Sequence, residues 1–393
     1  MFRIPIKERD DWKMLAEEYG FHFHTMHGER YWDESAYYQF TLAQIEHDLE
    51  APSEDIHQMC LHVVDKVIKD ENLMQRFGLP AKHWDFIAQS WQTKAPSLYS
   101  RLDFAYDGKS PAKLYENNAD TPTSLYETGF WQWLWLEQNV NQGRLSIDCD
   151  QFNSLQEKLI ARLRQILQIE QTKRAGQTLH FACCKGSIED RGTVQYLEDC
   201  AAEAGIATEF IYVEDIGRDL AGQLTDSKNQ VITWIFKLYP WEFMLNESFG
   251  DLLGRHPVSF IEPPWKSLLS NKALLPMLWR EFPDHPNLLP AYFGDEIHNV
   301  TSENTWVKKP LFSREGANVS IIQSGNIVVE TDGPYGQEGH IYQQAHMLPK
   351  FDNSYTLIGS WLVNDQAAGI SVREDSSPIT QDMSRYLPHV IRG

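Results

Sequence analysis

Two short segments on either side of a predicted turn carry polar side chains at alternate positions. Arg101 and Asp103 precede the turn, and Glu116 and Asn118 follow it. Because side chains at i and i+2 of a strand point to the same face, each pair would project together from an extended segment. A simple antiparallel hairpin over residues 100–120 would place Arg101 opposite Asn118 and Asp103 opposite Glu116, so all four would share one face.

Such a face has the chemistry of a magnesium–phosphate site. Carboxylate and amide oxygens suit Mg²⁺, which commonly takes one or two carboxylates together with substrate phosphates, and a guanidinium pairs with phosphate through two hydrogen bonds. The alternative is an ordinary surface hairpin, because charges also alternate along half-exposed strands. Asp107-Gly108 lies off the centre of the turn, so we expect a bulge or a longer loop.

Two lysines elsewhere add positive charge that suits phosphate. Lys309 ends a predicted strand, and a polar loop containing Gly316 follows it. Backbone N–H groups of such a loop can bind phosphate, although Gly316 is more often simply a hairpin residue. Lys272 lies at the predicted start of a helix over residues 271–282, where a positive charge is mildly unfavourable and indicates either an anionic partner or plain surface exposure.

The composition limits the class of protein. Lys and Arg number 35 against 55 Asp and Glu, and the net charge of −20 argues against nucleic acid as the main partner, since phosphate backbones call for clustered basic residues. No stretch reaches the ~20 apolar residues of a membrane span, and the first residues lack the apolar core of a signal peptide. Five cysteines, two of them adjacent in an apolar run, indicate reduced thiols. We expect a cytoplasmic protein without membrane partners.

The pattern of elements predicts three regions and a mixed α+β or α/β fold. Residues 1–170 should be mainly helical and carry the metal-binding hairpin, while strands alternating with a helix over 171–262 predict a βαβ-type substrate domain with a largely parallel sheet. Residues 263–393 are rich in strand patterns and should form the nucleotide-binding region. A flexible loop is expected near 312–322.

Taken together, these segments resemble a known family. The stretches RLDF to YENNADTPTSL, FKLYPWE, EPPWKSLLSNKALLPMLWREFP, KKPLFSREGANV and IYQQAHMLPKFDNSY are similar to the synthetase domain of glutathionylspermidine synthases and to stand-alone acid–amine ligases. The resemblance extends over most of the chain and implies a circularly permuted ATP-grasp fold. It also implies an ATP- and Mg²⁺-dependent ligase that joins a carboxylic acid to an amine through an acylphosphate and releases ADP.

The resemblance further implies a role for individual residues of this chain. Arg101 would neutralise the transferred γ-phosphate, and Asp103, Glu116 and Asn118 would hold two Mg²⁺ ions, with Glu116 bridging them. The other implied ATP contacts are Leu102, Lys272, Lys309, Gly316, Gln343, Leu357, Pro378, Ile379 and Thr380. The implied contacts to the acid and amine substrates are Thr121, Glu189, Asp190 and Glu242.

Departures from the family pattern bear on the substrates. The amidase domain of bifunctional members has no counterpart here, so breakdown activity is not expected. An acidic position of the polyamine site falls on Arg385, which would repel spermidine and argues against glutathione and spermidine as substrates. The acid could be a peptide and the amine a polyamine or another amino compound, and the sequence leaves their identity and the oligomeric state open. A catalytically reduced ATP-binding regulatory protein and a small-acid kinase are the alternatives, but the complete metal set favours an enzyme.

Overall fold

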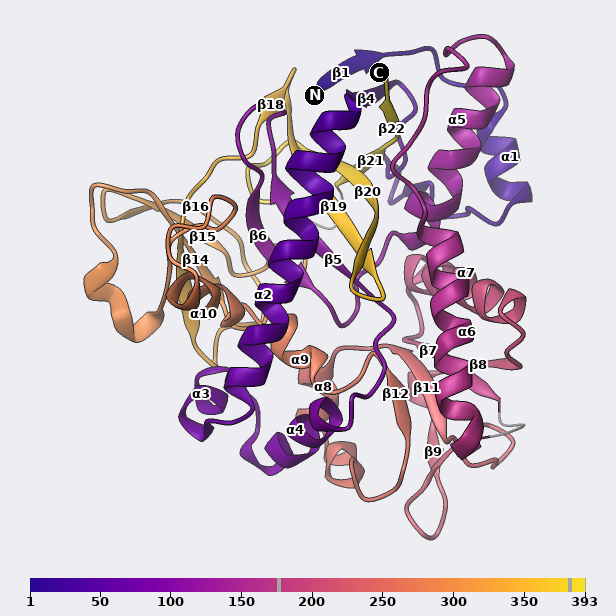
Figure 1. The fold of residues 1–393 in the computed structure, drawn as a ribbon, viewed down its shortest axis with the longest axis vertical. Coiled ribbons are helices and arrows are strands. Elements are labelled where there is room, and N and C mark those ends of the chain that lie inside the picture. Colours follow the sequence, from indigo (N-terminus) through magenta and orange to yellow (C-terminus); the bar gives the residue numbers. More distant parts are fainter. Residues whose placement is uncertain (175–177, 381–383, 393) are drawn as a thin grey trace.

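Three β-sheets carry most of the strands of the computed structural model, which describes residues 1–174, 178–380 and 384–392 (Figure 1). One sheet is parallel and the other two are antiparallel. The mixed α/β class expected from the sequence is therefore confirmed.

The predicted hairpin lies within a six-stranded sheet. Its strands β5 (Tyr99–Ala105) and β6 (Lys113–Asn118) pair with each other, and β5 also pairs with β19. The sheet continues with β19 (Ser354–Val363), β20 (Gln366–Asp375) and β21 (Arg385–Leu387), and β18 (Lys350–Phe351) adds to β19. Arg101 is opposite Asn118 and Asp103 is opposite Glu116, with an irregularity directly after Asp103. The predicted register is confirmed, and of the two expected alternatives, a bulge or a longer loop, the pairing shows an irregularity of the bulge type.

A four-stranded parallel sheet contains the predicted βαβ unit. Its order is β12 (Ser259–Ile261), β11 (Trp234–Leu238), β7 (Leu179–Cys183) and β8 (Thr208–Tyr212). Helix α7 (Ile188–Glu203) connects β7 to β8, and α6 (Leu155–Arg174) packs against α7. Strands β7 and β11 are buried throughout, which explains why their sequences are apolar apart from His180 and Lys237.

A five-stranded antiparallel sheet follows along the chain. Its order is β13 (Ala291–Phe293), β17 (His340–Gln344), β14 (Trp306–Pro310), β15 (Ser320–Gln323) and β16 (Asn326–Glu330). The helices α8 (Trp241–Asn246), α9 (Lys266–Leu269) and α10 (Leu274–Glu281) precede it. Helix α10 is shorter than predicted, and Pro276 lies in its first turn, where proline is tolerated.

The first forty residues contain strands where the sequence suggested helix. Strand β4 (Ala36–Phe40) pairs with β1 (Phe2–Pro5) and, in parallel, with the C-terminal β22 (His389–Ile391), so the two ends of the chain meet in one sheet (Figure 1). The aromatic residues of β4 suit a buried strand. Strands β2 (Thr25–Met26) and β3 (Glu29–Arg30) form a small hairpin after α1 (Trp12–Glu18). The remaining helices are α2 (Ala51–Val67), α3 (Glu71–Arg76), α4 (Trp84–Gln92) and α5 (Gln132–Asn141), and the short strands β9 (Gly217–Arg218) and β10 (Leu224–Thr225) pair with each other.

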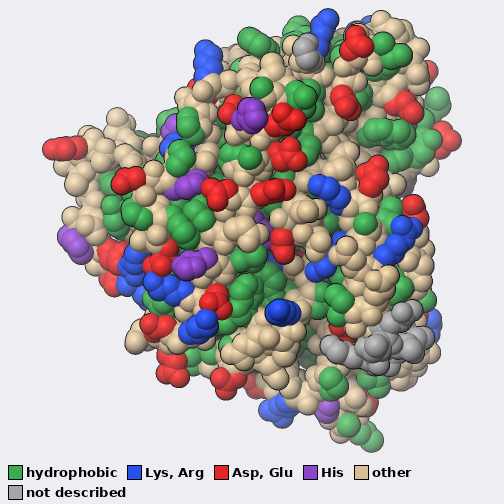
Figure 2. All heavy atoms as spheres, viewed as in Figure 1, with side chains coloured by type: hydrophobic (Ala, Val, Ile, Leu, Met, Phe, Trp, Pro, Cys, Tyr) green, Lys and Arg blue, Asp and Glu red, His purple; other side chains and the backbone are tan. Residues whose placement is uncertain are grey.

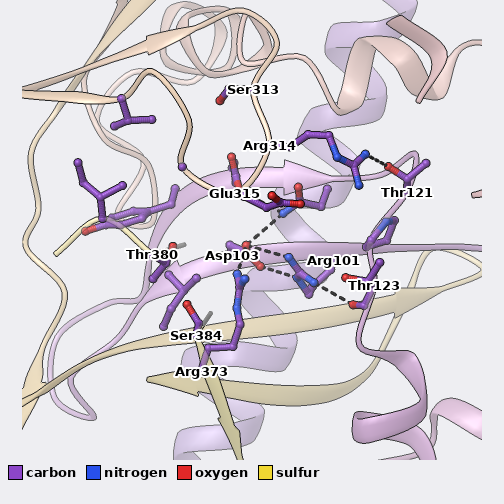
Figure 3. A pocket seen from close by; sticks show the side chains of 18 of the residues that line it. Arg101, Asp103, Thr121, Thr123, Ser313, Arg314, Glu315, Arg373, Thr380 and Ser384 are labelled. Atoms are coloured by element: carbon purple, nitrogen blue, oxygen red, sulfur yellow. Dashed lines mark hydrogen bonds and ion pairs between the residues drawn. The ribbon is translucent and has the colours of Figure 1, made fainter. Parts of the chain in front are cut away.

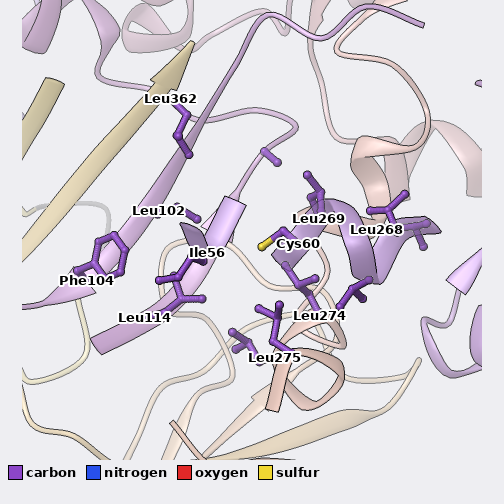
Figure 4. Close-up of a cluster of buried hydrophobic side chains, with 14 of the residues drawn as sticks. Ile56, Cys60, Leu102, Phe104, Leu114, Leu268, Leu269, Leu274, Leu275 and Leu362 are labelled. Atoms are coloured by element: carbon purple, nitrogen blue, oxygen red, sulfur yellow. The ribbon is translucent and has the colours of Figure 1, made fainter. Parts of the chain in front are cut away.

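Helix α2 covers one face of the hairpin and creates the main hydrophobic core. Ile56 and Cys60 of α2 belong to one buried cluster with Leu102, Phe104 and Leu114 of the two strands (Figure 4). Since alternate residues of β5 face opposite sides, this packing turns Arg101 and Asp103 away from the core. The hydrophobic residues thereby fix the orientation of the polar ones.

The surface shows acidic and basic side chains interspersed over one face (Figure 2).

All five cysteines are free thiols. Within the described residues, no helix has the length and apolar character needed to cross a membrane.

Candidate active site

A cavity of about 780 Å³ lies where the three sheets meet. Its walls include Asp103 of β5, Arg373 of β20 and Lys309 of β14, and the loops that follow β7 and β11 close one side. Ligands of open α/β sheets bind outside the carboxyl ends of parallel strands, and these two loops leave the parallel sheet at that edge. The cavity is large enough for a nucleotide-sized ligand.

Asp103 is held by two arginines at the floor of the cavity (Figure 3). Arg101 Nε donates to Asp103 Oδ1 at 2.7 Å and its Nη2 to Oδ2 at 3.2 Å, while Arg373 Nη2 donates to Oδ2 at 2.6 Å. Arg101 also donates to the carbonyl oxygen of Thr123 at 3.0 Å. Burial alone would lower the pKa of Arg101, but Asp103 raises it, so the guanidinium stays charged although it is almost completely enclosed.

Glycine at position 359 makes room for this arrangement. Gly359 lies opposite Asp103 on the neighbouring strand β19. A Cβ atom there would come within 2.7 Å of Arg101 Cδ and 2.6 Å of Ser371 Oγ. A larger residue would therefore push the Arg101 side chain out of its position beside Asp103.

Glu116 lies beside the two predicted phosphate-binding lysines. Its Oε2 is 3.1 Å from Lys272 Nζ, and its Oε1 accepts a hydrogen bond from Asn118 Nδ2 at 3.3 Å. Lys309 Nζ donates to Gln343 Oε1 at 2.7 Å, and burial lowers the pKa of this lysine to about 8. Burial by itself would raise the pKa of Glu116, but Lys272 and Lys309 lower it to about 2, so this carboxylate stays ionised.

A buried ion pair fixes the position of the loop that follows β6. Lys237 Nζ donates to Asp120 Oδ1 at 2.6 Å, and the backbone N–H of Trp241 donates to Asp120 Oδ2 at 2.7 Å. Ser270 Oγ accepts hydrogen bonds from the N–H groups of Ala119 and Asp120. These contacts hold the next residue, Thr121, at the cavity wall.

The loop between β14 and β15 closes over this wall. Arg314 Nη1 donates to Thr121 Oγ1 at 2.6 Å, so the loop touches the segment that follows the metal-binding candidates (Figure 3). Gly316 has φ +69°, and a Cβ atom there would lie 2.5 Å from the carbonyl oxygen of Thr380. Only glycine allows so close an approach between this loop and the segment 378–380.

The cavity wall also contains acidic side chains. Glu189, Asp190 and Glu242 all line it, beside residues of the β2–β3 segment. Burial and the nearby Asp120 raise the pKa of Glu242. Five cationic side chains line the same cavity, Arg101, Arg373, Lys272, Lys309 and Arg314. Four of them lie around Asp103 and Glu116 and are here called the cationic end, whereas Arg314 acts on the charge of Glu242.

Comparison with known protein families shows to which family the chain belongs. The family model "Glutathionylspermidine synthase preATP-grasp" matches residues 3–392. The chain belongs to the glutathionylspermidine synthase family. The resemblance stated from the sequence motifs is therefore confirmed, and the chain is a member of a family of C–N bond-forming ligases.

Curated relatives differ in length. A Haemophilus influenzae protein described as "Putative acid--amine ligase" is 40% identical over 92% of this chain and 91% of its own length. The bifunctional glutathionylspermidine synthetase/amidase of Escherichia coli is 27% identical over 91% of this chain, which spans only 60% of that longer protein. Trypanothione synthetase of Crithidia fasciculata is 28% identical over 83% of this chain and 52% of its own. A solved glutathione synthetase-like effector from Globodera pallida gives a TM-score of 0.48 at 12% identity, over 85% of this chain and 87% of its own.

Nearly all of the site residues predicted from the sequence line one cavity in the structure. Leu102 is the exception: its side chain is fully buried in the main core, on the opposite face of β5. The predicted residues that line the cavity are Arg101, Asp103, Glu116, Asn118, Thr121, Glu189, Asp190, Glu242, Lys272, Lys309, Gly316, Gln343, Leu357, Pro378, Ile379 and Thr380. Their individual roles remain predictions.

One inference from the family pattern needs correction. Arg385 was expected to repel a cationic substrate, but it is absent from the residues that line the cavity. Its Nη2 instead donates to Glu374 Oε2 at 2.9 Å and to Ser354 Oγ. Because Arg385 pairs with Glu374 and does not line the cavity, it gives no reason to exclude a polyamine.

Sequence reasoning missed Arg373 and Tyr31, which both line the cavity. Arg373 lies on β20, which pairs with β19, and β19 in turn pairs with β5, the strand that carries Asp103. The position of Arg373 beside Asp103 therefore follows only from the pairing of these three strands. Tyr31 comes from a loop more than sixty residues before the hairpin. Neither had a local sequence signal.

Proposed function

We propose that the protein is an ATP- and Mg²⁺-dependent ligase that joins a carboxylic acid to an amine through an acylphosphate. The observation that carries the proposal is that five cationic side chains and the carboxylates Glu189, Asp190 and Glu242 line one cavity. A triphosphate and a carboxylate need positive charge, whereas an amine at neutral pH carries a proton and needs negative charge. One cavity of this kind suits the joining of these two substrates.

The residues at the cationic end fit ATP with Mg²⁺. Asp103, Glu116 and Asn118 offer hard oxygen ligands on one face of the hairpin, and Glu116 is ionised because two lysines stabilise its charge. Mg²⁺, when bound there, would supply charge neutralisation for the phosphoryl group. The Nε of Arg373 is buried and lacks a hydrogen-bond acceptor among the described residues, which suits a site that receives an anion.

The chain's own residues would act by position and charge. Lys272 and Lys309 would bind phosphate oxygens of ATP, and Arg101 would offset charge on the γ-phosphoryl group while the substrate carboxylate attacks it. The attack forms a C–O–P linkage and releases ADP. The amine then attacks the acyl carbon, the C–O bond breaks, and phosphate leaves as the amide forms.

The 312–322 loop would protect this intermediate from water. Arg314 already contacts Thr121, and Gly316 packs against Thr380, so the loop spans the cavity from its substrate wall to the segment 378–380. Exclusion of water matters because an acylphosphate hydrolyses. The ATP-grasp fold, its circular permutation and the number of metal ions belong to this proposal.

Trapping with hydroxylamine tests the ligase. Purified protein is incubated with ATP, Mg²⁺, hydroxylamine and pools of small acids and peptides, and hydroxamate and ADP are measured together. We expect equal amounts of both with at least one acid and neither after addition of EDTA. Release of ADP with an acid but without any hydroxamate would favour the kinase, and nucleotide binding without ADP release would favour the regulatory protein.

A pair of variants links this activity to the cavity. Glu116→Gln removes a charge from the cationic end, and we expect hydroxamate formation to fall at least about 10²-fold. Glu281→Gln is the matched control, because Glu281 pairs with Lys66 outside the cavity. Equal losses in both variants would contradict the assignment of the cavity as the active site.

A further inference from the structure

A histidine and two carboxylates lie close together on the parallel sheet, away from the cavity. His180 of β7 lies opposite Glu209 of β8, so both side chains point to the same face of the sheet. Asp226 directly follows the short strand β10. One possible ligand atom from each of the three side chains lies within 4.8 Å of the other two. These residues are here called the His180–Glu209–Asp226 cluster.

Asp226 is held by a turn that leaves one of its oxygens free. Its Oδ1 accepts hydrogen bonds from the backbone N–H groups of Lys228 at 2.9 Å and Gln230 at 2.8 Å. The backbone N–H of Asp226 donates in turn to the carbonyl oxygen of Gln230 at 2.9 Å. The other carboxylate oxygen, Oδ2, lies 3.5 Å from His180 Nε2 and has no hydrogen-bond partner among the described residues. The turn therefore fixes Asp226 Oδ2 in a position that faces His180.

His180 is buried without the hydrogen bonds that a buried imidazole needs. The residue is 4% exposed and Asp226 is 5% exposed. Within the part of the chain that the structure describes, neither ring nitrogen of His180 has a hydrogen-bond partner. Buried polar groups are normally paired, because an unpaired one loses its hydration without compensation. Two unpaired buried atoms that face each other, His180 Nε2 and Asp226 Oδ2, therefore indicate a ligand that both of them bind.

The separation of these two atoms suits a shared metal ion better than a direct hydrogen bond. The donor and acceptor atoms of an N–H···O hydrogen bond are about 2.7–3.2 Å apart. Nitrogen and oxygen ligands lie about 2.1 Å from Zn²⁺, and tetrahedral geometry then places two ligands about 3.4 Å from each other. The 3.5 Å between His180 Nε2 and Asp226 Oδ2 is close to this second distance.

Glu209 supplies a third ligand at the more exposed side of the cluster. Its Oε1 accepts a hydrogen bond from Lys228 Nζ. A carboxylate has two oxygens and about four lone-pair sites, so this bond leaves room for a metal ion. The Lys228 side chain is exposed and Glu209 is partly exposed, and ion pairs at such positions are weak. An ion could therefore enter from solvent past Glu209, and a water molecule could take a fourth position there.

We propose that the His180–Glu209–Asp226 cluster binds one divalent transition-metal ion such as Zn²⁺, through one imidazole nitrogen and two carboxylate oxygens. Imidazole together with carboxylate suits such an ion, whereas Mg²⁺ takes oxygen ligands. Binding at Nε2 uses the neutral ring with its proton on Nδ1. Two carboxylates beside one lysine also leave a net negative charge that attracts a cation.

The ion would hold the segment 217–232 to the parallel sheet. Asp226 belongs to this segment, whereas His180 and Glu209 belong to β7 and β8. None of the three residues lines the cavity, which the loop after the carboxyl end of β7 helps to form, and His180 is the second residue of that strand. The site is therefore structural and does not depend on the proposed ligase function.

The variant Asp226→Asn tests the site with little change to the turn. Asparagine keeps an Oδ1 that accepts the two backbone hydrogen bonds, and it replaces Oδ2 by an amide nitrogen, which does not bind a metal ion. Metal-free wild type and variant are dialysed against the same Zn²⁺ solution, and bound zinc is measured by atomic emission. We expect the wild type to bind one more equivalent than Asp226→Asn, with an affinity that falls at least about 10²-fold on loss of this ligand. Zinc held elsewhere, by thiols or by the cavity, is the same in both proteins and cancels in the difference.

Two further variants complete the test. Glu209→Ala, at the partly exposed ligand, should lose the same equivalent without disturbing the buried residues. Asp365→Asn is the matched control, because Asp365 Oδ1 lies 2.8 Å from Nε2 of the buried His57, which is the distance of an ordinary hydrogen bond. This control should bind as much zinc as the wild type.

Thermal unfolding gives a second readout. A ligand that binds only the folded state raises the melting temperature, so saturating Zn²⁺ should stabilise the wild type by about 3 °C or more beyond its effect on Asp226→Asn and Glu209→Ala. Equal zinc content in the wild type and both cluster variants would overturn the site and leave a protonated His180 beside Asp226 as the explanation of the cluster. Loss of the same equivalent in Asp365→Asn would overturn it as well. Neither result depends on whether the protein forms a hydroxamate.

Discussion

Arg101 has two functions that its contacts separate. Its guanidinium donates two hydrogen bonds to Asp103. The same charged group faces the cavity from β5, where it would contact the transferred phosphoryl group. We predict that Arg101→Ala lowers turnover by about 10²- to 10³-fold, as expected for loss of a charge that acts in the transition state. The dissociation constant of ATP should rise much less, because Lys272 and Lys309 remain. Steady-state kinetics and calorimetric titration with ATP measure the two quantities.

Arg280→Ala provides the control for this prediction. Arg280 pairs with Glu296 and does not line the cavity, so its loss should leave both quantities unchanged. Unchanged turnover in Arg101→Ala would remove Arg101 from the phosphoryl-transfer site.

Some residues of the site could be predicted from the local sequence alone. Alternation along a strand was enough to place Arg101, Asp103, Glu116 and Asn118 on one face, because the period of a strand is independent of the rest of the fold. The buried Glu127, which accepts a hydrogen bond from Tyr31 at the cavity wall, had no such signal. Burial and the charge of Glu189 raise the pKa of Glu127, while the hydrogen bond from Tyr31 lowers it, and both partners come from distant segments of the chain.

At the scale of elements, the loop between β14 and β15 depends on a single glycine. Alanine at position 316 would add strain of about 1–2 kcal/mol at a positive φ and would also collide with the backbone of Thr380. We predict that Gly316→Ala raises the KM for ATP about tenfold or more and makes the loop more susceptible to limited proteolysis. Both effects follow because the loop can no longer rest against the segment 378–380.

The variant Gly325→Ala distinguishes the effect of backbone strain from the effect of a collision with Thr380. Gly325 has φ +78° in the next turn, between β15 and β16, and a Cβ atom there would meet nothing within 4 Å. This variant should lose a little stability and keep the KM for ATP. If both glycine variants bind ATP as the wild type does, contact between the loop and the segment 378–380 is unimportant for nucleotide binding.

Element prediction was most accurate where a segment has a strong alternating or apolar pattern of its own. The βαβ segment and the C-terminal strands have strong patterns of their own, and the structure confirms them. The N-terminal strand β4 was missed because its identity depends on β1 and on β22, which lies at the other end of the chain. A strand that pairs over such a distance leaves only a weak local pattern.

At the scale of the whole molecule, His389 links the C-terminal strand β22 to Gln132 and Phe152 and should make stability depend on pH. It lies fully buried in β22, where Nδ1 is 2.9 Å from Gln132 Oε1 and Nε2 accepts a hydrogen bond from the backbone N–H of Phe152 at 3.0 Å. An Nε2 that accepts this bond must be unprotonated, so the folded protein needs the neutral ring. Burial accordingly lowers the pKa of His389 from 6.5 to about 3.

The sign of the effect follows from which state binds the proton. Between pH 6.5 and 3 the unfolded chain takes up a proton at His389 and the folded protein does not. Stability is therefore complete above pH 6.5 and falls as the pH is lowered, by up to about 1.4 kcal/mol for each unit. We predict that His389→Gln is less stable than the wild type at pH 7, while its melting temperature falls less steeply between pH 6.5 and 4.5. His298→Gln, at an exposed histidine, should follow the wild-type slope. A His389→Gln slope equal to that of the wild type would mean that the acid sensitivity of the molecule arises elsewhere than at His389.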